Sequence, residues 1–187
     1  MKKKGLIINL CSEWLHYHEF VKPIEDILKN SDEKYFVRNY LDLDKKDIEK
    51  TSKIIICGTP LNDDFYMQNI KKFEFIKKLK IPLLGICAGC QIINLIFGGE
   101  VSNRTDIGML KVNFQRDLLG IKKGDREVYN LHNYSLSKIP DDFEIFSGEE
   151  KNESVQAIKH KKNQIYGVMF HPEVRNKEFI SNFLKMN

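Results

Sequence analysis

Residues 82–91 read Pro-Leu-Leu-Gly-Ile-Cys-Ala-Gly-Cys-Gln, and this stretch decides the predicted fold. It opens with a short apolar run up to Cys87, which is typical of a buried strand. An apolar helical pattern follows at once and ends at Gly98-Gly99, where glycine adopts a left-handed cap at little cost. We therefore expect a strand that gives way directly to a helix, with a cysteine at the junction.

Strands and helices alternate along the whole first half of the chain. Short apolar runs predict three further strands, at 5–10, 34–37 and 53–57. The last of these is continuous and β-branched, which suits a central parallel strand covered on both faces. Helical spacing of apolar residues predicts helices at 18–29 and 62–80. This alternation predicts an α/β fold with a central, mostly parallel sheet flanked by helices.

The pattern changes from residue 100 onward. Short alternating segments predict strands at 100–102, 109–114, 128–131, 143–146, 154–158 and 165–170. They indicate an antiparallel or mixed extension of the sheet, closed by a helix over 177–185. No linker, repeat or low-complexity stretch interrupts the chain, so we expect residues 1–187 to form one domain.

Composition and charge exclude several classes of protein. The 187 residues are 42% hydrophobic and 30% charged, which is ordinary for a globular domain. The net charge is only +4, and no basic stripe is interleaved with aromatic residues, so we expect no nucleic-acid partner. No apolar run reaches the ~18 residues that span a bilayer, and the N-terminal run is too short for a signal peptide. We predict no membrane association and a cytoplasmic location.

Cys87 stands between two glycines, Gly85 and Gly89, at the predicted strand-to-helix turn. This arrangement matches the nucleophile elbow, G-x-(Ser/Cys)-x-G, in which a sharp turn needs small neighbours and projects the nucleophile beyond the sheet. The helix N-terminus favours the thiolate, the reactive form. The N–H of Ala88 is placed to stabilise an oxyanion.

The motif alone leaves alternatives open. Cys87 and Cys90 form a C-x-x-C pair, as in thioredoxin-like redox sites. Cys57 with this pair and a histidine could hold zinc, although only one pair has metal spacing. A buried structural cysteine is the plainest alternative. The four cysteines do not suggest a disulfide framework in a chain of this length.

A second motif, His171-Pro172-Glu173, follows a predicted apolar strand. Positions i and i+2 of an extended chain face the same way, so Glu173 can accept a hydrogen bond from the ring of His171. Such a contact would fix the tautomer of the ring and raise its basicity, as the third member of a catalytic triad does. By itself this tripeptide is more typical of a structural loop.

Together the two motifs resemble those of a known family. Gly85-Ile-Cys-Ala-Gly-Cys-Gln91, followed by Gly98-Gly99, resembles the G-x-C-x-G-x-Q element of class-I glutamine amidotransferases, which have a flavodoxin-like fold. Residues 165–174, Ile-Tyr-Gly-Val-Met-Phe-His-Pro-Glu-Val, resemble the closing motif of that family. Order and spacing agree across nearly the whole chain.

The resemblance implies a glutaminase mechanism. Cys87 would attack the carboxamide of glutamine, while His171 would transfer protons and Glu173 would orient His171. The oxyanion would lie between the N–H of Ala88 and a backbone N–H of the Gly58-Thr59-Pro60 turn, from Gly58 or Thr59. The expected substrate-binding residues are Gln91, Tyr134 and Ser135. No cofactor or metal is expected; Asp63 and Asp64 are assigned to a helix N-terminus.

Within the family, residues 158–168 resemble the separate glutaminase subunit of archaeal-type GMP synthases, and so imply a role in nucleotide biosynthesis. Three segments depart from that subtype. Thr59 stands where the subtype has the second glycine of Gly-Gly-Pro, and residues 131–136 replace its Ser-His-x-Asp segment in a style nearer to other amidotransferases and to γ-glutamyl hydrolases. Residues 11–18 lack the glycine-glutamine pattern expected of the subtype.

The chain has no G-x-x-x-x-G-K-[ST] phosphate loop and no room for a synthetase domain. A separate ammonia-accepting synthetase is therefore the implied partner. A free-standing γ-glutamyl hydrolase with the same triad is the alternative. An idle regulatory protein is the third possibility, and the intact Cys87, His171 and Glu173 argue against it.

Overall fold

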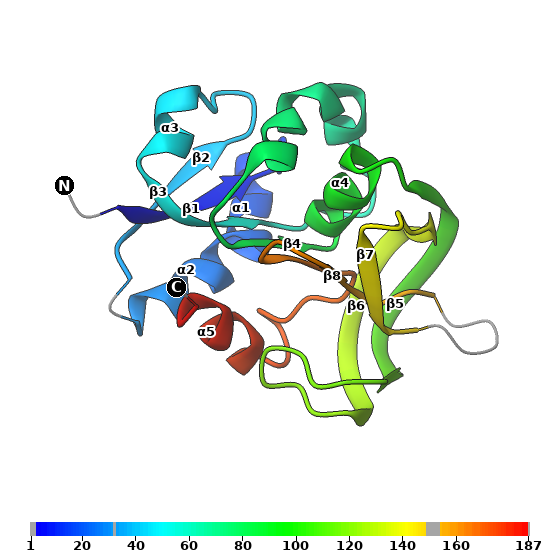
Figure 1. Ribbon diagram of the computed structural model, residues 1–187. Helices are drawn as coiled ribbons and strands as arrows, with labels where there is room; N and C mark the ends of the chain where they lie inside the picture. The colour runs from blue at the N-terminus through cyan, green and yellow to red at the C-terminus, as the bar shows by residue number, and fades with distance from the viewer. Residues whose placement is uncertain (1–2, 32, 149–153, 187) are drawn as a thin grey trace.

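A computed structural model describes residues 3–31, 33–148 and 154–186. Its nine strands form one sheet in the order β2-β1-β3-β4-β9-β8-β7-β5-β6 (Figure 1). The strands are β1 (Lys4–Asn9), β2 (Tyr35–Asn39), β3 (Thr51–Ile56), β4 (Leu83–Ile86), β5 (Glu100–Phe114), β6 (Gly124–Lys138), β7 (Phe143–Ser147), β8 (Ala157–His160) and β9 (Ile165–Val168). The predicted α/β fold with a mixed extension is confirmed.

The first half of the sheet is parallel. β1 pairs with β2 and β3, β3 pairs with β4, and β4 pairs with β9, all in parallel register. The side chains of Ile54, Ile55 and Ile56 in β3 are almost completely buried, as expected for a strand covered on both faces. Because β4 pairs in parallel with both β3 and β9, the carboxyl ends of these three strands lie side by side.

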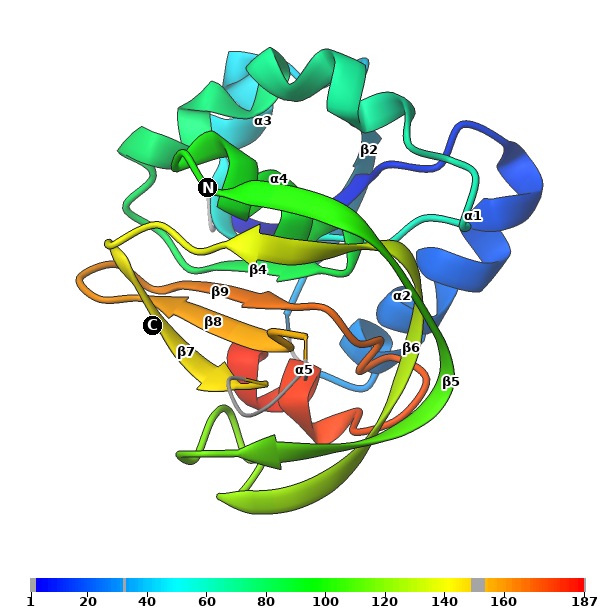
Figure 2. The same ribbon diagram turned by 90° about the vertical axis from the view of Figure 1, so that its right-hand side faces the viewer.

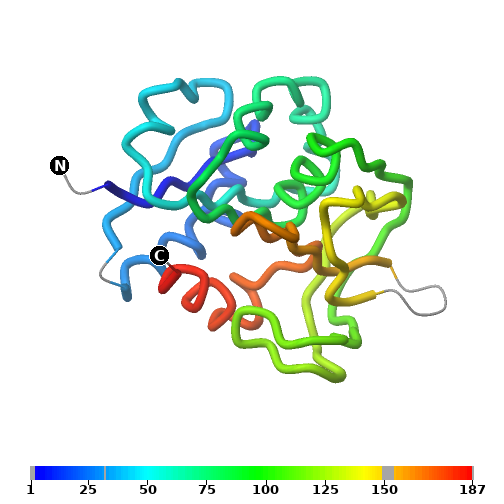
Figure 3. The backbone as a smooth tube through the Cα atoms, viewed as in Figure 1, coloured from blue at the N-terminus to red at the C-terminus, as the bar shows by residue number. Residues whose placement is uncertain are grey.

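Helices cover the two faces of this parallel part (Figure 1). One face carries α3 (Lys45–Glu49), the 3₁₀ segment η1 (Phe65–Lys78) and α4 (Ala88–Ile96). The other carries α2 (Lys22–Lys29), preceded by α1 (Trp14–Phe20), and α5 (Glu178–Leu184). In Figure 3 the last helix, in red, lies beside α2, in blue. The buried ammonium of Lys53 in β3 donates to the carbonyls of Leu184 and Met186 and so holds this end of the chain against the sheet.

The second half of the sheet is antiparallel. β5 and β6 pair from Glu100–Lys138 to Phe114–Gly124 and form a long curved ribbon (Figure 2). β5 joins the rest of the sheet through one pairing, Phe114 with Ser147 of β7. β7 pairs with β8, and β8 with β9, so the chain returns to the parallel part. The ribbon brings residues 131–134 over the carboxyl ends of the parallel strands, next to Cys87.

Several element boundaries differ from those predicted. The helix expected over 18–29 is two helices that meet at Val21, and the helix expected over 62–80 is a 3₁₀ segment with a break at Asn69. The strands expected at 100–102 and 109–114 are parts of one strand, β5. The sequence did not indicate its middle part, because the polar residues there are mostly exposed and show no alternating apolar pattern. The short helix α3 was not predicted, although Asp44 and Asp47 form its capping box.

No helix among the described residues is long and apolar enough to cross a membrane.

Candidate active site

The strand-to-helix junction has the geometry of an elbow. Cys87 lies between the last residue of β4 and the first of α4, with a φ of 49°, in a region that L side chains rarely adopt. A Cβ added at Gly85 would lie 2.5 Å from the carbonyl group of Gly89, and one added at Gly89 would lie 2.5 Å from the carbonyl oxygen of Ile56. Only glycine therefore fits at either position, and the turn holds Cys87 at the end of the sheet.

His171 and Glu173 lie just beyond the end of β9. The Nδ1 atom of His171 is 2.7 Å from Oε1 of Glu173, so the contact predicted from their i and i+2 spacing is present. Both residues are 1% exposed. The His171 backbone N–H donates to the carbonyl of Tyr129 at 2.8 Å. The rings of Phe20 and His171 pack in a T-shaped arrangement, with their centroids 5.6 Å apart. The imidazole is thus fixed by a carboxylate, a strand and an aromatic ring.

Gly58 shows how close His171 and Cys87 are. A Cβ added at Gly58 would lie 2.6 Å from Cε1 of His171 and 3.3 Å from Cβ of Cys87. Burial by itself would lower the pKa of the His171 imidazolium, but the negative charges of Glu173 and of a Cys87 thiolate raise this pKa well above its usual value. The site therefore favours the protonated form of His171.

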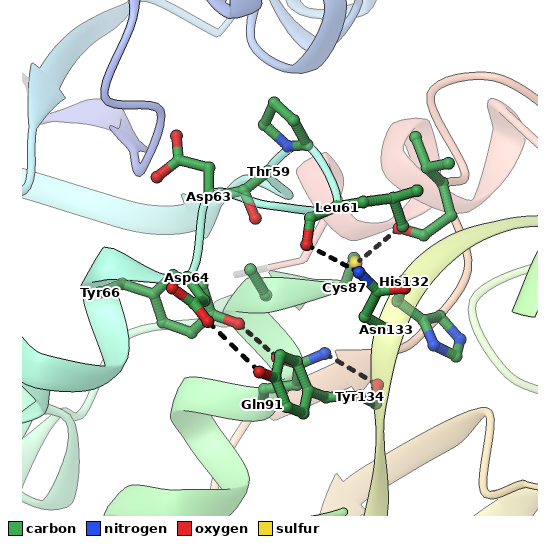
Figure 4. A pocket seen from close by; sticks show the side chains of 13 residues that line it. Thr59, Leu61, Asp63, Asp64, Tyr66, Cys87, Gln91, His132, Asn133 and Tyr134 are labelled. Carbon is green, nitrogen blue, oxygen red and sulfur yellow. Dashed lines mark hydrogen bonds between the residues drawn. The ribbon is translucent and has the colours of Figure 1, made fainter. Parts of the chain in front are cut away.

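A small cavity opens beside Cys87 (Figure 4). Its volume is about 10 Å³, which is room for about one water molecule. Parts of the chain far apart in sequence line it, including Thr59, Leu61, Asp64, Tyr66, Cys87, Ala88, Gln91, Leu131, His132, Asn133 and Tyr134. The cavity is bounded by the turn after β3, the start of α4 and the ribbon strand β6.

The ribbon is tied to the other walls by hydrogen bonds. The thiol of Cys87 donates to the carbonyl of Leu131 at 3.6 Å, and the side-chain amide of Asn133 donates to the carbonyl of Leu61 at 3.0 Å. The hydroxyl of Tyr134 donates to the carboxylate of Asp64 at 3.3 Å. These contacts hold β6 against the turn after β3 and the start of α4, and they keep the cavity narrow.

Most of the predicted site residues meet at this cavity. Ala88 and Thr59 border it beside Cys87, where their amides were expected to bind an oxyanion, whereas Gly58 lies behind, against His171. Gln91 and Tyr134 also line it.

The structure does not bring Ser135 into the cavity. Its side chain is buried on the opposite face of β6 from Tyr134, because successive strand residues alternate sides.

The side chain of Gln91 is engaged at both ends. Its Oε1 accepts a hydrogen bond from the hydroxyl of Tyr66, and its Nε2 donates to the carbonyl of Tyr134 at 3.0 Å. Gln91 thus joins η1, α4 and β6 around the cavity (Figure 4).

Several lining residues were not predicted from the sequence, among them Asp64, Tyr66, Leu131 and Asn133. Asp64 and Tyr66 follow the Gly58-Thr59-Pro60 turn, which was itself assigned to the site. Their closeness to this turn in the sequence is the one signal that could have placed them at the cavity.

His132 also borders the cavity. Its Nε2 atom is 3.8 Å from the carboxylate of Asp106. Burial lowers the pKa of His132, and the charge of Asp106 offsets this only in part. A neutral ring is therefore favoured.

Cys90 has a different environment from Cys87. It is completely buried, and its sulfur would lie 2.6 Å from a Cβ on Gly167 of β9, so it packs under the sheet rather than facing the cavity. Burial raises the pKa of the Cys90 thiol, and the nearby charge of Cys87 adds to this. A buried thiol of raised pKa is unreactive, which argues against the redox alternative. Among the described residues no cluster of three His, Cys, Asp or Glu side chains is arranged to hold a metal.

Comparisons with known proteins agree with this geometry. The family model described as "Glutamine amidotransferase class-I" matches residues 16–187. A protein of Sulfolobus acidocaldarius described as a glutamine-hydrolyzing GMP synthase subunit is 36% identical over an alignment of 122 residues. The alignment covers 60% of this chain and 64% of that protein, which is less than two thirds of its length. The corresponding protein of Saccharolobus solfataricus is 33% identical over 150 residues, 74% of this chain and 78% of its own.

A solved structure shares the fold. A Thermoplasma acidophilum protein described as a GMP synthase subunit superposes with a TM-score of 0.82, at 23% identity, over 98% of this chain and 95% of its own. The family model covers nearly the whole chain, and the motifs that carry the resemblance bring Cys87 and His171 together beside Gly58. The chain therefore belongs to the class-I glutamine amidotransferase family.

Proposed function

We propose that this protein is a glutaminase that hydrolyses glutamine to glutamate and ammonia at Cys87 and passes the ammonia to a separate synthetase. The observation that carries the proposal is the meeting of Cys87, His171 and Glu173. An elbow cysteine lies beside a buried imidazole, and a carboxylate 2.7 Å from the imidazole orients it. This is the arrangement of nucleophile, base and orienting group that acyl transfer needs.

The first half of the reaction is attack on the carboxamide. The Cys87 thiolate adds to the carboxamide carbon, and the oxyanion is held by the amides of Ala88 and Thr59. The His171 imidazolium then gives its proton to the departing nitrogen, the C–N bond breaks, and ammonia leaves a γ-glutamyl thioester. The raised pKa of His171 keeps this proton available at neutral pH.

The second half is hydrolysis of the thioester. His171, now neutral, takes a proton from water while the water oxygen attacks the thioester carbon. The C–S bond breaks, glutamate leaves, and the thiolate–imidazolium pair is restored. Glu173 keeps Nδ1 of His171 protonated in both halves, so that Nε2 faces the reacting groups.

The synthetase partner is proposed from the relatives of this chain, which include proteins described as subunits of GMP synthase. The synthetase part of a GMP synthase is therefore the first partner to test. The closed cavity fits a glutaminase that is slow until a partner shifts the ribbon.

The test is glutamate formation from glutamine by the wild-type protein, with and without that synthetase. We expect a low rate alone and a higher rate with the synthetase, ATP and the nucleotide acceptor, and no activity from Cys87→Ala with an unchanged circular dichroism spectrum. Full activity alone on γ-glutamyl peptides, with no response to any synthetase, would instead establish the free-standing γ-glutamyl hydrolase. The ribbon segment at 131–136 is the feature that favours this second candidate.

A further inference from the structure

Asp64 places a carboxylate in the wall of the catalytic cavity (Figure 4). It is the N-cap residue of η1, but its side chain makes no capping hydrogen bond to that helix. Its carboxylate instead accepts a hydrogen bond from the hydroxyl of Tyr134 at 3.3 Å. Among the residues that the structure describes, none forms an ion pair with Asp64. The half-buried carboxylate of Asp64 is thus bonded to a neutral hydroxyl, and that hydrogen bond is long.

The neighbouring Asp63 has a different role. It also borders the cavity, but its carboxylate is turned toward Ser12, from which it accepts the backbone N–H at 2.7 Å and the hydroxyl at 2.8 Å. Figure 4 shows the two carboxylates pointing in different directions. Asp63 therefore fastens the loop, and Asp64 remains available to a ligand.

Asp64, Tyr66 and Cys87 line the same small cavity. Burial raises the pKa of the Tyr66 hydroxyl well above its usual value, and the negative charges of Cys87, Asp64 and Asp63 raise it further. A ligand whose reacting carbon lies at Cys87 can place a second group near Asp64.

We propose that Asp64 binds the α-ammonium group of the substrate and so restricts the site to γ-carboxamides with a free α-amino group. The inference rests on the proposed glutaminase function. Glutamine carries its ammonium three carbons from the reacting carboxamide carbon, and an ammonium forms charge-assisted hydrogen bonds with a carboxylate.

Binding exchanges one partner of Asp64 for another. The cavity of about 10 Å³ is too small for glutamine, so we expect β6 to move away from the 59–64 turn when the substrate enters. That movement separates the hydroxyl of Tyr134 from Asp64. The α-ammonium then replaces a neutral donor by a cationic one, which is the stronger hydrogen-bond partner.

The test compares two substrates and two matched variants. Asp64→Asn removes the charge that faces the cavity, and Asp63→Asn removes the same charge one residue away. Each is assayed with glutamine and with its analogue that lacks the α-amino group, 4-carbamoylbutanoate. For Asp64→Asn we expect KM for glutamine to rise by about 10- to 100-fold, with kcat changed less than about fivefold. For Asp64→Asn we expect no change in KM for the analogue. For Asp63→Asn, which loosens the loop, we expect the same change in KM with both substrates.

Binding to a protein that cannot turn over separates this inference from the proposed function. Calorimetric titration of glutamine into Cys87→Ala, with and without Asp64→Asn, should show the same loss of affinity. Turnover by the wild type together with unchanged KM and affinity in Asp64→Asn would overturn the inference alone. Equal losses on glutamine and the analogue in Asp64→Asn would show a structural role and also overturn it. Binding that depends on Asp64 without any turnover would overturn the proposed function alone, and absence of both would overturn both.

Discussion

The parallel half of the sheet and the antiparallel ribbon contribute to the site in different ways. The parallel half holds Cys87 and His171 at the ends of β4 and β9, where buried strands and obligatory glycines leave them no freedom. The ribbon β5–β6 meets the rest of the sheet at one β5–β7 pairing and contacts the cavity through Leu131, Asn133 and Tyr134. The difference indicates that the rate of the chemistry depends on the parallel half, and access of the substrate depends on the ribbon.

The largest effect is expected in the parallel half, at Glu173. Glu173→Gln keeps the shape of the side chain but removes the charge that raises the pKa of His171. We expect kcat to fall by about 10²- to 10⁴-fold, because the imidazole loses its orientation and its proton. Steady-state kinetics of glutamate formation measures this. A fall of less than threefold would show that Glu173 has no part in orienting His171.

The same variant has a pH signature. A pKa raised by folding stabilises the native state fully at pH values below the unfolded pKa of about 6.5, and that contribution is lost as the pH rises through the raised folded pKa. In Glu173→Gln this contribution should be smaller, because one of the charges that raise the pKa of His171 is gone. The difference in unfolding free energy between wild type and variant should therefore be largest below pH about 6.5 and should decrease toward alkaline pH.

A smaller effect is expected at Gly58. The Cβ of Gly58→Ala would lie 2.6 Å from the ring of His171, so the imidazole must move. Displacement of a catalytic group by about 1 Å costs about 100-fold, and we expect a loss of that order in kcat. Gly5→Ala in β1 is the control, since its Cβ meets its nearest neighbour at an ordinary 3.5 Å. Equal activity of the two alanine variants would contradict the packing of Gly58 against His171.

The ribbon is tested at Asn133, with a still smaller effect. Asn133→Ala removes the hydrogen bond to the carbonyl of Leu61 that helps to hold the cavity closed. One such bond contributes about 0.5–1.5 kcal/mol, so KM for glutamine should fall by up to about tenfold as the open form becomes more populated. We expect a smaller change in kcat. A rise in KM would mean that Asn133 contacts the substrate, and the proposed division of roles would then need revision.

The smallest effect is expected at His160, the last residue of β8, which lies outside the catalytic cavity. Burial lowers the pKa of His160, and its Nδ1 accepts backbone hydrogen bonds from Lys162 and Asn163 at 3.0 Å. Since the neutral ring is the one that fits, its stabilising contribution is present above pH about 6.5 and is lost as the pH falls through the lowered folded pKa. Denaturant unfolding between pH 5 and 8 should show this loss in the wild type and not in His160→Gln. The glutaminase rate should be the same in both.

The two halves also differ in how much the sequence reveals. The elbow at Cys87 and the spacing of His171 and Glu173 are local patterns, because a strand turn and an i, i+2 contact depend on neighbours in sequence. The ribbon has no such pattern. Polar, exposed residues interrupt β5, and its register with β6 shifts between Asn103 and Asp106.

The cavity contacts of the ribbon are also distant in sequence. Asp64 and Tyr134 are 70 residues apart, and Asn133 and Leu61 are 72 apart. Such pairs are set by the tertiary fold alone. The same reason explains why Gln91 was identified as a site residue while its partner Tyr66 was not, and why Ser135 was assigned to the cavity although the alternation of β6 turns it away.

The most direct test of the central claim, that Cys87 attacks glutamine, is covalent labelling with the glutamine analogue 6-diazo-5-oxo-norleucine. Intact mass and peptide mapping would locate the adduct, with Cys87→Ala and Cys90→Ala as matched controls. We predict one adduct, on Cys87, that excess glutamine blocks, that is absent from Cys87→Ala and that persists in Cys90→Ala. Labelling of Cys90, or labelling that glutamine does not reduce, would contradict the account.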